Sequence, residues 1–459
     1  MRILFINRLY VVLLLAFLLP LLLSGCLSEF FGWEKNALTP EPTEITSTSD
    51  RVKTIKGLPG EQSAQERKMT KLCPPVEEKL FTPQLIPQAP ESLMPLSTLA
   101  TQPLSDFPQA PVRREASTSP PDFYYCDAML TEDTAWHGEV LIEGGVTIAP
   151  QTTLTVQSGT VVRFKGRAGA GAHAVLVVQG RIVVNGAADK PIIFTSLYED
   201  ATTGDWQGIV LLASGKKNLI ENCRIIGAET GFDASFSTVT FKNAFFSKCR
   251  TGARLQESFA VMTGGGAGEC GAGMLLYDCE ADIRSADFFG NRLGIFAAGT
   301  SLSLTDSRFT GNNLLALTAD TCRLNIMGSS FTANGNGLSL AGCEGAITAN
   351  RIDKNAAYGL SLAHSKVKVN SNEIEQNAKI GLRVEDGKGI AWGNAISANG
   401  DYDLCNAGSE EFRAIGNWWG NITVDVAGRI YDQHMDAGRG RVLYLPVMQK
   451  RPDPVALWE

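Results

Sequence analysis

The chain has 459 residues, a formal net charge of −7 and 44% hydrophobic residues. This length can hold more than one ordinary domain, and the mild acidic excess gives no basic patch of the kind that a nucleic-acid partner requires. The histidines and cysteines follow none of the spacings that are typical of zinc or haem sites. We therefore expect no nucleic-acid partner, no metal site and no cofactor.

Residues 1–25 have the pattern of an export signal. Arg2 and Arg8 precede an apolar run that Pro20 interrupts, and small residues typical of a cleavage site follow it. The sequence Leu-Ser-Gly-Cys, which ends at Cys26, resembles the lipobox of bacterial lipoproteins. This resemblance implies cleavage before Cys26 and a membrane anchor of lipid on that residue, and Leu27 after it favours the outer membrane of the cell envelope. An uncleaved membrane anchor and an ordinary signal peptide remain as alternatives.

Residues 26–122 have the composition of a flexible tether. Fourteen of the 20 prolines lie between Pro40 and Pro121, and no apolar periodicity persists in this part of the chain. Such a segment cannot bury enough apolar surface to offset the entropy that ordering it would lose. We expect it to hold the folded part of the protein away from the membrane.

The residues that follow the tether have the pattern of β-strands. VLIEGGVTIAPQTTLTVQSGTVVRF, AVLVVQGRIVVNG and KPIIFTS alternate apolar and polar residues in short runs that turn residues separate. A period of two residues indicates strands with one buried face. No amphipathic helix of ten or more residues is expected after residue 139, so the sequence predicts an all-β fold.

One motif recurs through the second half of the chain. NRIDKNAAYGL begins at Asn350, and NEIEQNAKIGL begins 22 residues later at Asn372. Four columns of residues share this spacing of 21 or 22 residues, which is very improbable by chance. They are an Asn column (Asn291, Asn312, Asn334, Asn355, Asn377, Asn399), a Gly column (Gly231, Gly252, Gly273, Gly294, Gly337, Gly359, Gly381), a column of small residues (Ser258, Cys279, Thr300, Cys322, Cys343, Ser365, Gly387) and an apolar column (Phe288, Phe309, Phe331, Ile352, Ile374, Ile396).

A repeat of this length without a helix predicts a β-solenoid. Each strand would pair with the same strand of the next coil at about 4.8 Å. We expect the Gly column to supply the corner dihedral angles, and each inward Asn to bond the backbone and the Asn of the next coil. Roughly thirteen coils fit in the repeat region, so that residues 123–445 would form the solenoid and 446–459 a C-terminal tail.

The strand-rich segment and the coils resemble the right-handed parallel β-helix proteins of the pectate-lyase-like superfamily. The sequence GNWWG at residues 416–420 resembles the closing coil of such repeats, so we expect Trp418 and Trp419 to cap the open core. The superfamily contains polysaccharide lyases, glycosidases and epimerases, but their ordered catalytic motifs are absent from this sequence. We therefore predict a non-enzymatic scaffold that binds polysaccharide or an envelope protein on its lateral face, with a polysaccharide lyase or glycoside hydrolase as the alternative.

The alternative function depends on one weak catalytic candidate, Glu280 and Asp282 together with Arg254. The two carboxylates would face the same way about 7 Å apart on one strand, which is a separation found in inverting glycosidases. A solvated salt-bridge ladder is the favoured interpretation, because the column of Glu280 continues with alternating charge at Arg323, Glu344 and Lys366.

Aromatic side chains mark the candidate ligand face. Phe296 and Tyr277 would point outward from neighbouring coils, and Phe259 would point outward from another strand. Exposed rings of this kind stack on sugars or dock a protein. The alternative is a coil face that a loop covers.

The cysteines leave the state of two stacked pairs open. Neighbouring coils place the Cα atoms at about 4.8 Å, which lies within disulfide range. Reduced core thiols are the favoured alternative, because the same columns elsewhere hold Asn, Ser, Thr or Gly. A further, weaker hypothesis is that Cys73 and Cys126 clip the tether to the first coil. The two stacked pairs are Cys249 with Cys270 and Cys322 with Cys343.

Overall fold

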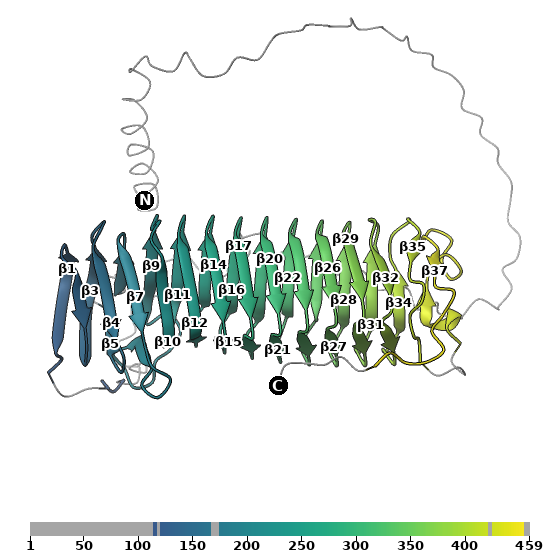
Figure 1. Ribbon diagram of the computed structural model, residues 1–459. Helices are drawn as coiled ribbons and strands as arrows, with labels where there is room; N and C mark the ends of the chain where they lie inside the picture. The colour runs from purple at the N-terminus through teal and green to yellow at the C-terminus, as the bar shows by residue number, and fades with distance from the viewer. Residues whose placement is uncertain (1–112, 117–119, 167–173, 421–424, 454–459) are drawn as a thin grey trace, which may run out of the picture. The chain divides into compact units, whose positions relative to one another are not determined.

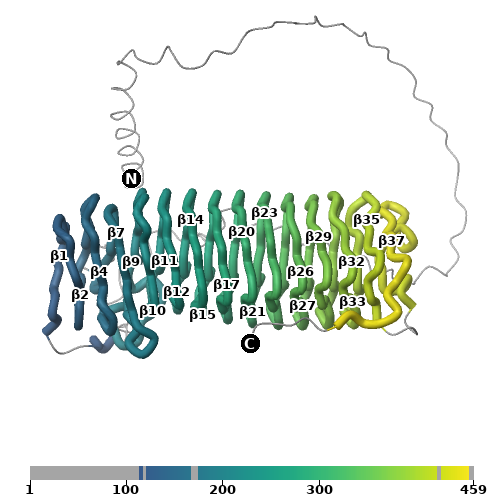
Figure 2. The backbone as a smooth tube through the Cα atoms, in the orientation of Figure 1, coloured from purple at the N-terminus to yellow at the C-terminus, as the bar shows by residue number. Residues whose placement is uncertain are grey.

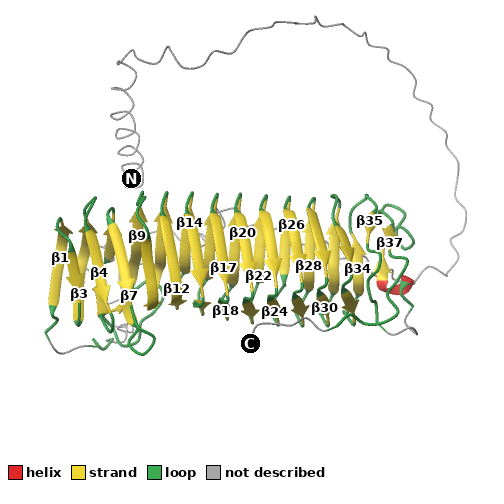
Figure 3. Ribbon diagram, viewed as in Figure 1, coloured by secondary structure: helices red, strands yellow, loops and turns green. Residues whose placement is uncertain are grey.

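The computed structural model describes residues 113–116, 120–166, 174–420 and 425–453. Within them the fold is an all-β parallel solenoid of about 13 turns, with one short 3₁₀ helix, η1 (Ala427–Arg429), as Figures 1 and 3 show. The predicted fold class is confirmed. The expected signal peptide, Cys26 and the tether as far as residue 112 lie outside the described residues. No helix in the described ranges is long and apolar enough to cross a membrane.

The coils stack side by side in one row (Figure 2). Each strand pairs in parallel with the equivalent strand of the next coil, so the pairings build three long sheets, which we call A, B and C. Four long strands bend at a corner and belong to two sheets. β1 (Phe123–Leu130) and β3 (Glu139–Ile148) run from sheet C into sheet A, and β10 (Asn218–Ile226) and β12 (Thr238–Ser247) run from sheet B into sheet C.

The remaining strands each belong to one sheet. Sheet A contains β6 (Val175–Val178), β9 (Trp206–Leu212), β11 (Ala228–Ser235), β13 (Thr251–Gln256), β16 (Ala272–Tyr277), β19 (Leu293–Ala298), β22 (Leu315–Asp320), β25 (Leu338–Ala341), β28 (Tyr358–Ala363), β31 (Ile380–Glu385), β34 (Tyr402–Asn406) and β36 (Ile430–Tyr431). Sheet B contains β2 (Thr134–Trp136), β4 (Thr153–Gln157), β7 (Arg181–Asn185), β14 (Phe259–Thr263), β17 (Glu280–Arg284), β20 (Ser301–Thr305), β23 (Arg323–Met327), β26 (Glu344–Thr348), β29 (Lys366–Asn370), β32 (Ile390–Trp392), β35 (Phe412–Arg413) and β37 (Val442–Leu443). Sheet C contains β5 (Val161–Lys165), β8 (Ile192–Ser196), β15 (Gly266–Gly268), β18 (Asp287–Phe289), β21 (Arg308–Thr310), β24 (Ser330–Thr332), β27 (Arg351–Asp353), β30 (Glu373–Glu375) and β33 (Ala395–Ser397).

Every second side chain along each strand points inward, and these inward side chains fill the space between the three sheets. The apolar column predicted from the sequence lies here, with Phe288, Phe309 and Phe331 all fully buried. Their rings stack with centroids 4.9 Å apart at both steps, which is close to the spacing of paired strands. Every coil therefore adds one ring, or one Ile in the later coils, to a continuous apolar column.

The Asn column forms a buried hydrogen-bond ladder, as predicted. In each coil from Asn291 to Asn377 the backbone N–H and the side-chain amide donate to the Oδ1 of the next Asn, for example from Asn355 to Asn377 at 3.2 and 2.8 Å. Each Asn from Asn291 to Asn399 also donates to a carbonyl group of the coil before it. Buried polar groups need such partners, so the ladder specifies which residue can occupy this corner.

The Gly column has a different role from the one we predicted. Gly273 and its equivalents lack the positive φ of a left-handed corner; their special property is close approach. A Cβ on Gly273 would lie 2.5 Å from the carbonyl oxygen of Gly294 and 2.8 Å from the ring of Phe288. The absence of a side chain, rather than backbone freedom, therefore keeps glycine in this column.

The left-handed corners lie elsewhere, and most of them are not glycine. After sheet A the positive φ falls on Glu257, Asp278, Gly299, Thr321, Gly342, His364 and Asp386, again at intervals of 21 or 22 residues. Two further columns follow sheets B and C. Each coil thus turns three times through a residue in the αL region, which Asn, Asp and Gly adopt most easily.

The last residues of the predicted tether range contact the solenoid. Arg113 donates to Asp205 at 2.6 Å and to Asp200 at 3.0 Å, and its guanidinium lies 4.3 Å from the ring centroid of Tyr198. Glu115 forms an antiparallel bridge with Tyr198. These contacts anchor residues 113–116 on the first coils.

Candidate functional site

The outward face of sheet A carries the predicted aromatic pair. Asp233, Arg254, Leu275 and Phe296 occupy one column on successive strands. Tyr277 occupies the neighbouring column, and its ring centroid lies 5.5 Å from that of Phe296. Both rings are half-buried, and burial raises the pKa of Tyr277 above its ordinary value.

An ion pair occupies the same column as Phe296, with Leu275 on the strand between them. The Nε of Arg254 donates to Asp233 at 3.0 Å, and a second nitrogen binds the other carboxylate oxygen, so the contact is bidentate. These hydrogen bonds raise the pKa of the Arg254 guanidinium above its usual value. One face of sheet A therefore presents an ion pair and two aromatic rings within four successive strands.

The other candidate residues lie on sheet B. Phe259 on β14 is 41% exposed and pairs in register with Glu280 on β17. Asp282 lies two residues after Glu280 and accepts hydrogen bonds from Arg284 on the same strand, one of them at 2.9 Å. The structure therefore brings Phe259 together with the carboxylate candidates, but places Arg254, Tyr277 and Phe296 on a different sheet.

The expected salt-bridge ladder on sheet B does not form within the described residues. Arg323, Glu344 and Lys366 do follow one another in register, but no ion pair within 4.0 Å links these three exposed side chains. Exposed charges gain little from a fixed pair. On sheet B, Asp282 pairs with Arg284 of its own strand, and ion pairs on the other two sheets include Asp233 with Arg254, Asp287 with Arg308 and Glu373 with Arg351.

The described part of the chain holds no group of three or more His, Cys, Asp or Glu side chains arranged to bind a metal ion. Of the histidines, His137 packs edge-on against Phe123 and His434 lies 3.0 Å from Asp432. His364 occupies a left-handed corner, and His173 lies outside the described residues.

The four stacked cysteines are free thiols in the structure, as is Cys126, so the hypothetical Cys73–Cys126 clip is wrong. The buried sulfurs donate to nearby carbonyl groups, for example from Cys343 to Ala341 at 3.2 Å. Burial raises the pKa of the Cys223 thiol to about 12. One cysteine differs from the others: Cys405 is disulfide-bonded. The four stacked cysteines are Cys249, Cys270, Cys322 and Cys343.

A second hydrophobic cluster, which the sequence analysis missed, surrounds Cys405 on sheet A. It is separate from the main core and contains Tyr358, Ile380, Tyr402, Cys405 and Tyr431. The rings of Tyr402 and Tyr431 are 5.2 Å apart. We call this group the tyrosine cluster. A weak signal existed in the sequence, because Tyr358, Ile380 and Tyr402 recur at intervals of 22 residues.

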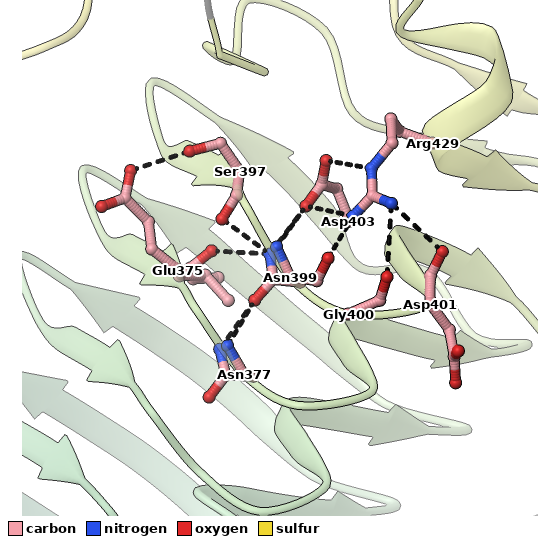
Figure 4. Close-up of polar contacts among 9 residues, drawn as sticks. Glu375, Asn377, Ser397, Asn399, Gly400, Asp401, Asp403 and Arg429 are labelled. Atoms are coloured by element: carbon pink, nitrogen blue, oxygen red, sulfur yellow. Dashed lines mark hydrogen bonds and ion pairs between the residues drawn. The ribbon is translucent and has the colours of Figure 1, made fainter.

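A polar cluster lies at the end of the Asn ladder, near the C-terminal end of the solenoid (Figure 4). Asn399, the last Asn of the ladder, donates to Asp403, which also binds Arg429. Trp419 is buried in the core, while Trp418 lies outside it, with the guanidinium of Arg451 5.3 Å from its ring centroid. Trp419 thus lies where a cap for the core was expected.

Two family models match this chain. The model described as a pectate-lyase-like β-helix domain matches residues 128–237, and the model described as a right-handed β-helix region matches residues 266–400. Both descriptions name a β-helix, and the second names the right hand. The hand of the solenoid and its pectate-lyase-like character therefore agree with the resemblance seen in the sequence.

The chain is also similar to solved β-helix structures, at low identity. A mutant of the periplasmic alginate epimerase AlgG is 13% identical, with 67% of this chain and 77% of that chain covered and a TM-score of 0.40. The A-module of the mannuronan C-5 epimerase AlgE4 from Azotobacter vinelandii is 13% identical, with coverage of 69% and 91% and a TM-score of 0.36. Tailspike protein 3 of bacteriophage CBA120 is 12% identical, with coverage of 71% and 56% and a TM-score of 0.37. No curated protein matches. At these values the likenesses carry no argument about activity.

Proposed function

We propose that this protein is a lipid-anchored scaffold of the bacterial cell envelope, which binds polysaccharide on the outward face of sheet A without cleaving it. The observation that carries the proposal is that the contacting rings of Tyr277 and Phe296 share one outward face with the ion pair of Arg254 and Asp233. Aromatic faces stack on the apolar faces of sugar rings, and a fixed guanidinium donates hydrogen bonds to hydroxyl or carboxylate groups.

The anchor rests on the lipobox-like sequence at Cys26, with Leu27 favouring the outer membrane. Labelling cells with a radioactive fatty acid tests this part separately. The full chain is expected to carry label, and the Cys26→Ser variant to carry none. A labelled Cys26→Ser variant, or an unlabelled full chain, would refute the lipid anchor.

The binding face is tested with the full chain in detergent on an array of bacterial and algal polysaccharides. Tyr277→Ala/Phe296→Ala is expected to weaken binding about tenfold or more, which corresponds to about 1.4 kcal/mol. Phe289→Ala is the matched control, because Phe289 is an exposed ring on sheet C that stacks on Phe245. Equal losses in both variants would overturn the proposed face. Binding of an envelope protein in place of any glycan would keep the scaffold but change its ligand.

The alternative is a polysaccharide lyase or hydrolase at Glu280 and Asp282. The observation that favours it is that both carboxylates belong to the exposed face of one short strand, β17. Mass analysis of the glycans released from the array separates the two functions. Products that disappear in Glu280→Gln/Asp282→Asn would establish the enzyme, whereas bound glycans of unchanged mass support the scaffold.

A further inference from the structure

Three outward side chains near the C-terminal end of sheet A are almost completely buried. Thr318 and Ser339 on its outward column are half-buried, as is usual for this face. The next three positions of the same column, Ser361, Arg383 and Cys405, are only 7%, 5% and 0% exposed. Their inward neighbours already fill the main core, and the tyrosine cluster packs around Cys405. We infer that a further segment of the chain lies over Ser361 and Arg383.

The disulfide bond of Cys405 indicates which segment of the chain this is. The chain has ten cysteines, of which eight are described. Seven of those eight are free thiols and Cys405 is disulfide-bonded. Its partner is therefore one of the two cysteines outside the described residues, Cys26 or Cys73.

We propose that the tether segment around Cys73 docks on the tyrosine cluster and is held there by a disulfide between Cys73 and Cys405. The choice of Cys73 rests on the proposed lipid anchor, because a Cys26 sulfur that carries lipid cannot form a disulfide. The sequence LCPPV around Cys73 suits this surface, since Pro74 and Pro75 follow the cysteine directly.

The chemistry of the two surfaces is complementary. Proline-rich segments in the extended polyproline conformation dock on grooves lined by aromatic side chains, and they lose little entropy on binding. The tyrosine cluster provides such rings. A Pro-rich segment also carries few backbone N–H groups that would need a partner on this apolar surface.

The bond forms by thiol–disulfide exchange in an oxidising compartment. Two thiols lose two protons and two electrons, and a disulfide-bonded oxidoreductase outside the cytoplasm takes up the electrons and becomes a dithiol. The result is a covalent loop that fixes the tether to the last coils. Only the residues between Cys26 and Cys73 then remain as a free spacer between membrane and solenoid.

The test is a tryptic peptide map of the full chain, alkylated in detergent without reduction. We expect residues 72–79 to be linked to residues 389–413 in nearly all molecules, and the two peptides to separate on reduction. Cys73→Ser should abolish this link, whereas Cys126→Ser, which removes an exposed free thiol, should leave it unchanged. In Pro74→Ser/Pro75→Ser, the link should form several-fold more slowly during oxidative refolding, because the docked conformation is less populated.

Each adverse outcome has a distinct meaning. A link between Cys26 and Cys405 would overturn both this inference and the lipid anchor. A lipidated Cys26 with an unlinked Cys405 would overturn the docking alone. If Cys405 is alkylated in the protein alone but is protected from alkylation in the presence of polysaccharide, the tyrosine cluster binds a glycan instead of the tether.

Discussion

Asn399 donates two hydrogen bonds to a single carboxylate oxygen of Asp403, from its backbone N–H at 3.1 Å and from its side-chain amide at 2.9 Å. Every earlier Asn of the ladder makes the same two bonds to an Asn one coil away, but Asp403 lies only four residues further along the chain (Figure 4). Asp403 is 1% exposed, and Arg429 binds its second oxygen at 3.1 Å. The ladder therefore ends on the buried carboxylate of Asp403, and the guanidinium of Arg429 neutralises the charge of this carboxylate.

Asp403→Ala is expected to lower the free energy of unfolding by about 3 kcal/mol, because it leaves two donors of Asn399 and the charge of Arg429 without a partner. Asp403→Asn keeps the accepting oxygen and should lose only about 1 kcal/mol. Urea denaturation measures both. Hydrogen exchange should show that the loss opens the coil of Asn399 first. Equal stability of the two variants would contradict the role of Asp403 as the end of the ladder.

Two glycines should respond differently to the same substitution. Gly273→Ala is expected to destabilise the protein by about 3 kcal/mol, because the new Cβ would overlap the backbone of Gly294 and the ring of Phe288. Gly311 has a φ of +64° but nothing within 4 Å of a new Cβ. Ala333 already occupies the equivalent corner one coil on, with a φ of 56°.

Gly311→Ala should therefore lose about 1 kcal/mol or less. Thermal or urea unfolding of the two variants side by side checks the difference. A larger loss at Gly311 than at Gly273 would restore our original explanation, in which the Gly column provides the corners.

The sequence predicted the columns because a solenoid repeats identical environments. An Asn at the ladder corner or a Phe in the core recurs every 21 or 22 residues, since each coil must satisfy the same hydrogen bonds and fill the same volume. The left-handed corners were missed for the opposite reason. Glu257, Asp278, Thr321 and His364 all accept a positive φ, so geometry repeats there while residue type does not.

The candidate sites were less predictable than the fold. Register from the repeat placed Tyr277 and Phe296 on one outward face, which the structure agrees with. The register did not predict that Arg284 would bind Asp282 on the same strand. A contact between two residues of one strand produces no repeat of 21 or 22 residues in the sequence. The burial of the tyrosine cluster depends on the segment that we propose lies over sheet A. That segment is outside the repeat, so the repeating columns carry no information about it.

Asn355→Ala tests the ladder at its centre. Asn355 is fully buried; it accepts two hydrogen bonds from Asn334 and donates two to Asn377. We expect its removal to lower the free energy of unfolding by about 3 kcal/mol, because several buried groups lose their partners. The control is Asn325→Ala, an exposed Asn on β23, which should change stability by less than about 0.5 kcal/mol. Similar effects at the two positions would show that the ladder does not stabilise the coils.

Burial of Cys223 predicts a specific pH dependence. Its pKa is raised from 9.0 to about 12, so the unfolded chain loses this proton at a lower pH than the folded protein does. The stability that Cys223 contributes is therefore fully present below pH 9 and is lost as the pH rises towards 12. In that window the wild type should lose about 1.4 kcal/mol per pH unit more than Cys223→Ala, in which the new Ala matches Ala244 of the next coil. Urea denaturation from pH 8 to 11 measures the difference, and parallel curves for the two proteins would rule out a thiol held neutral by burial.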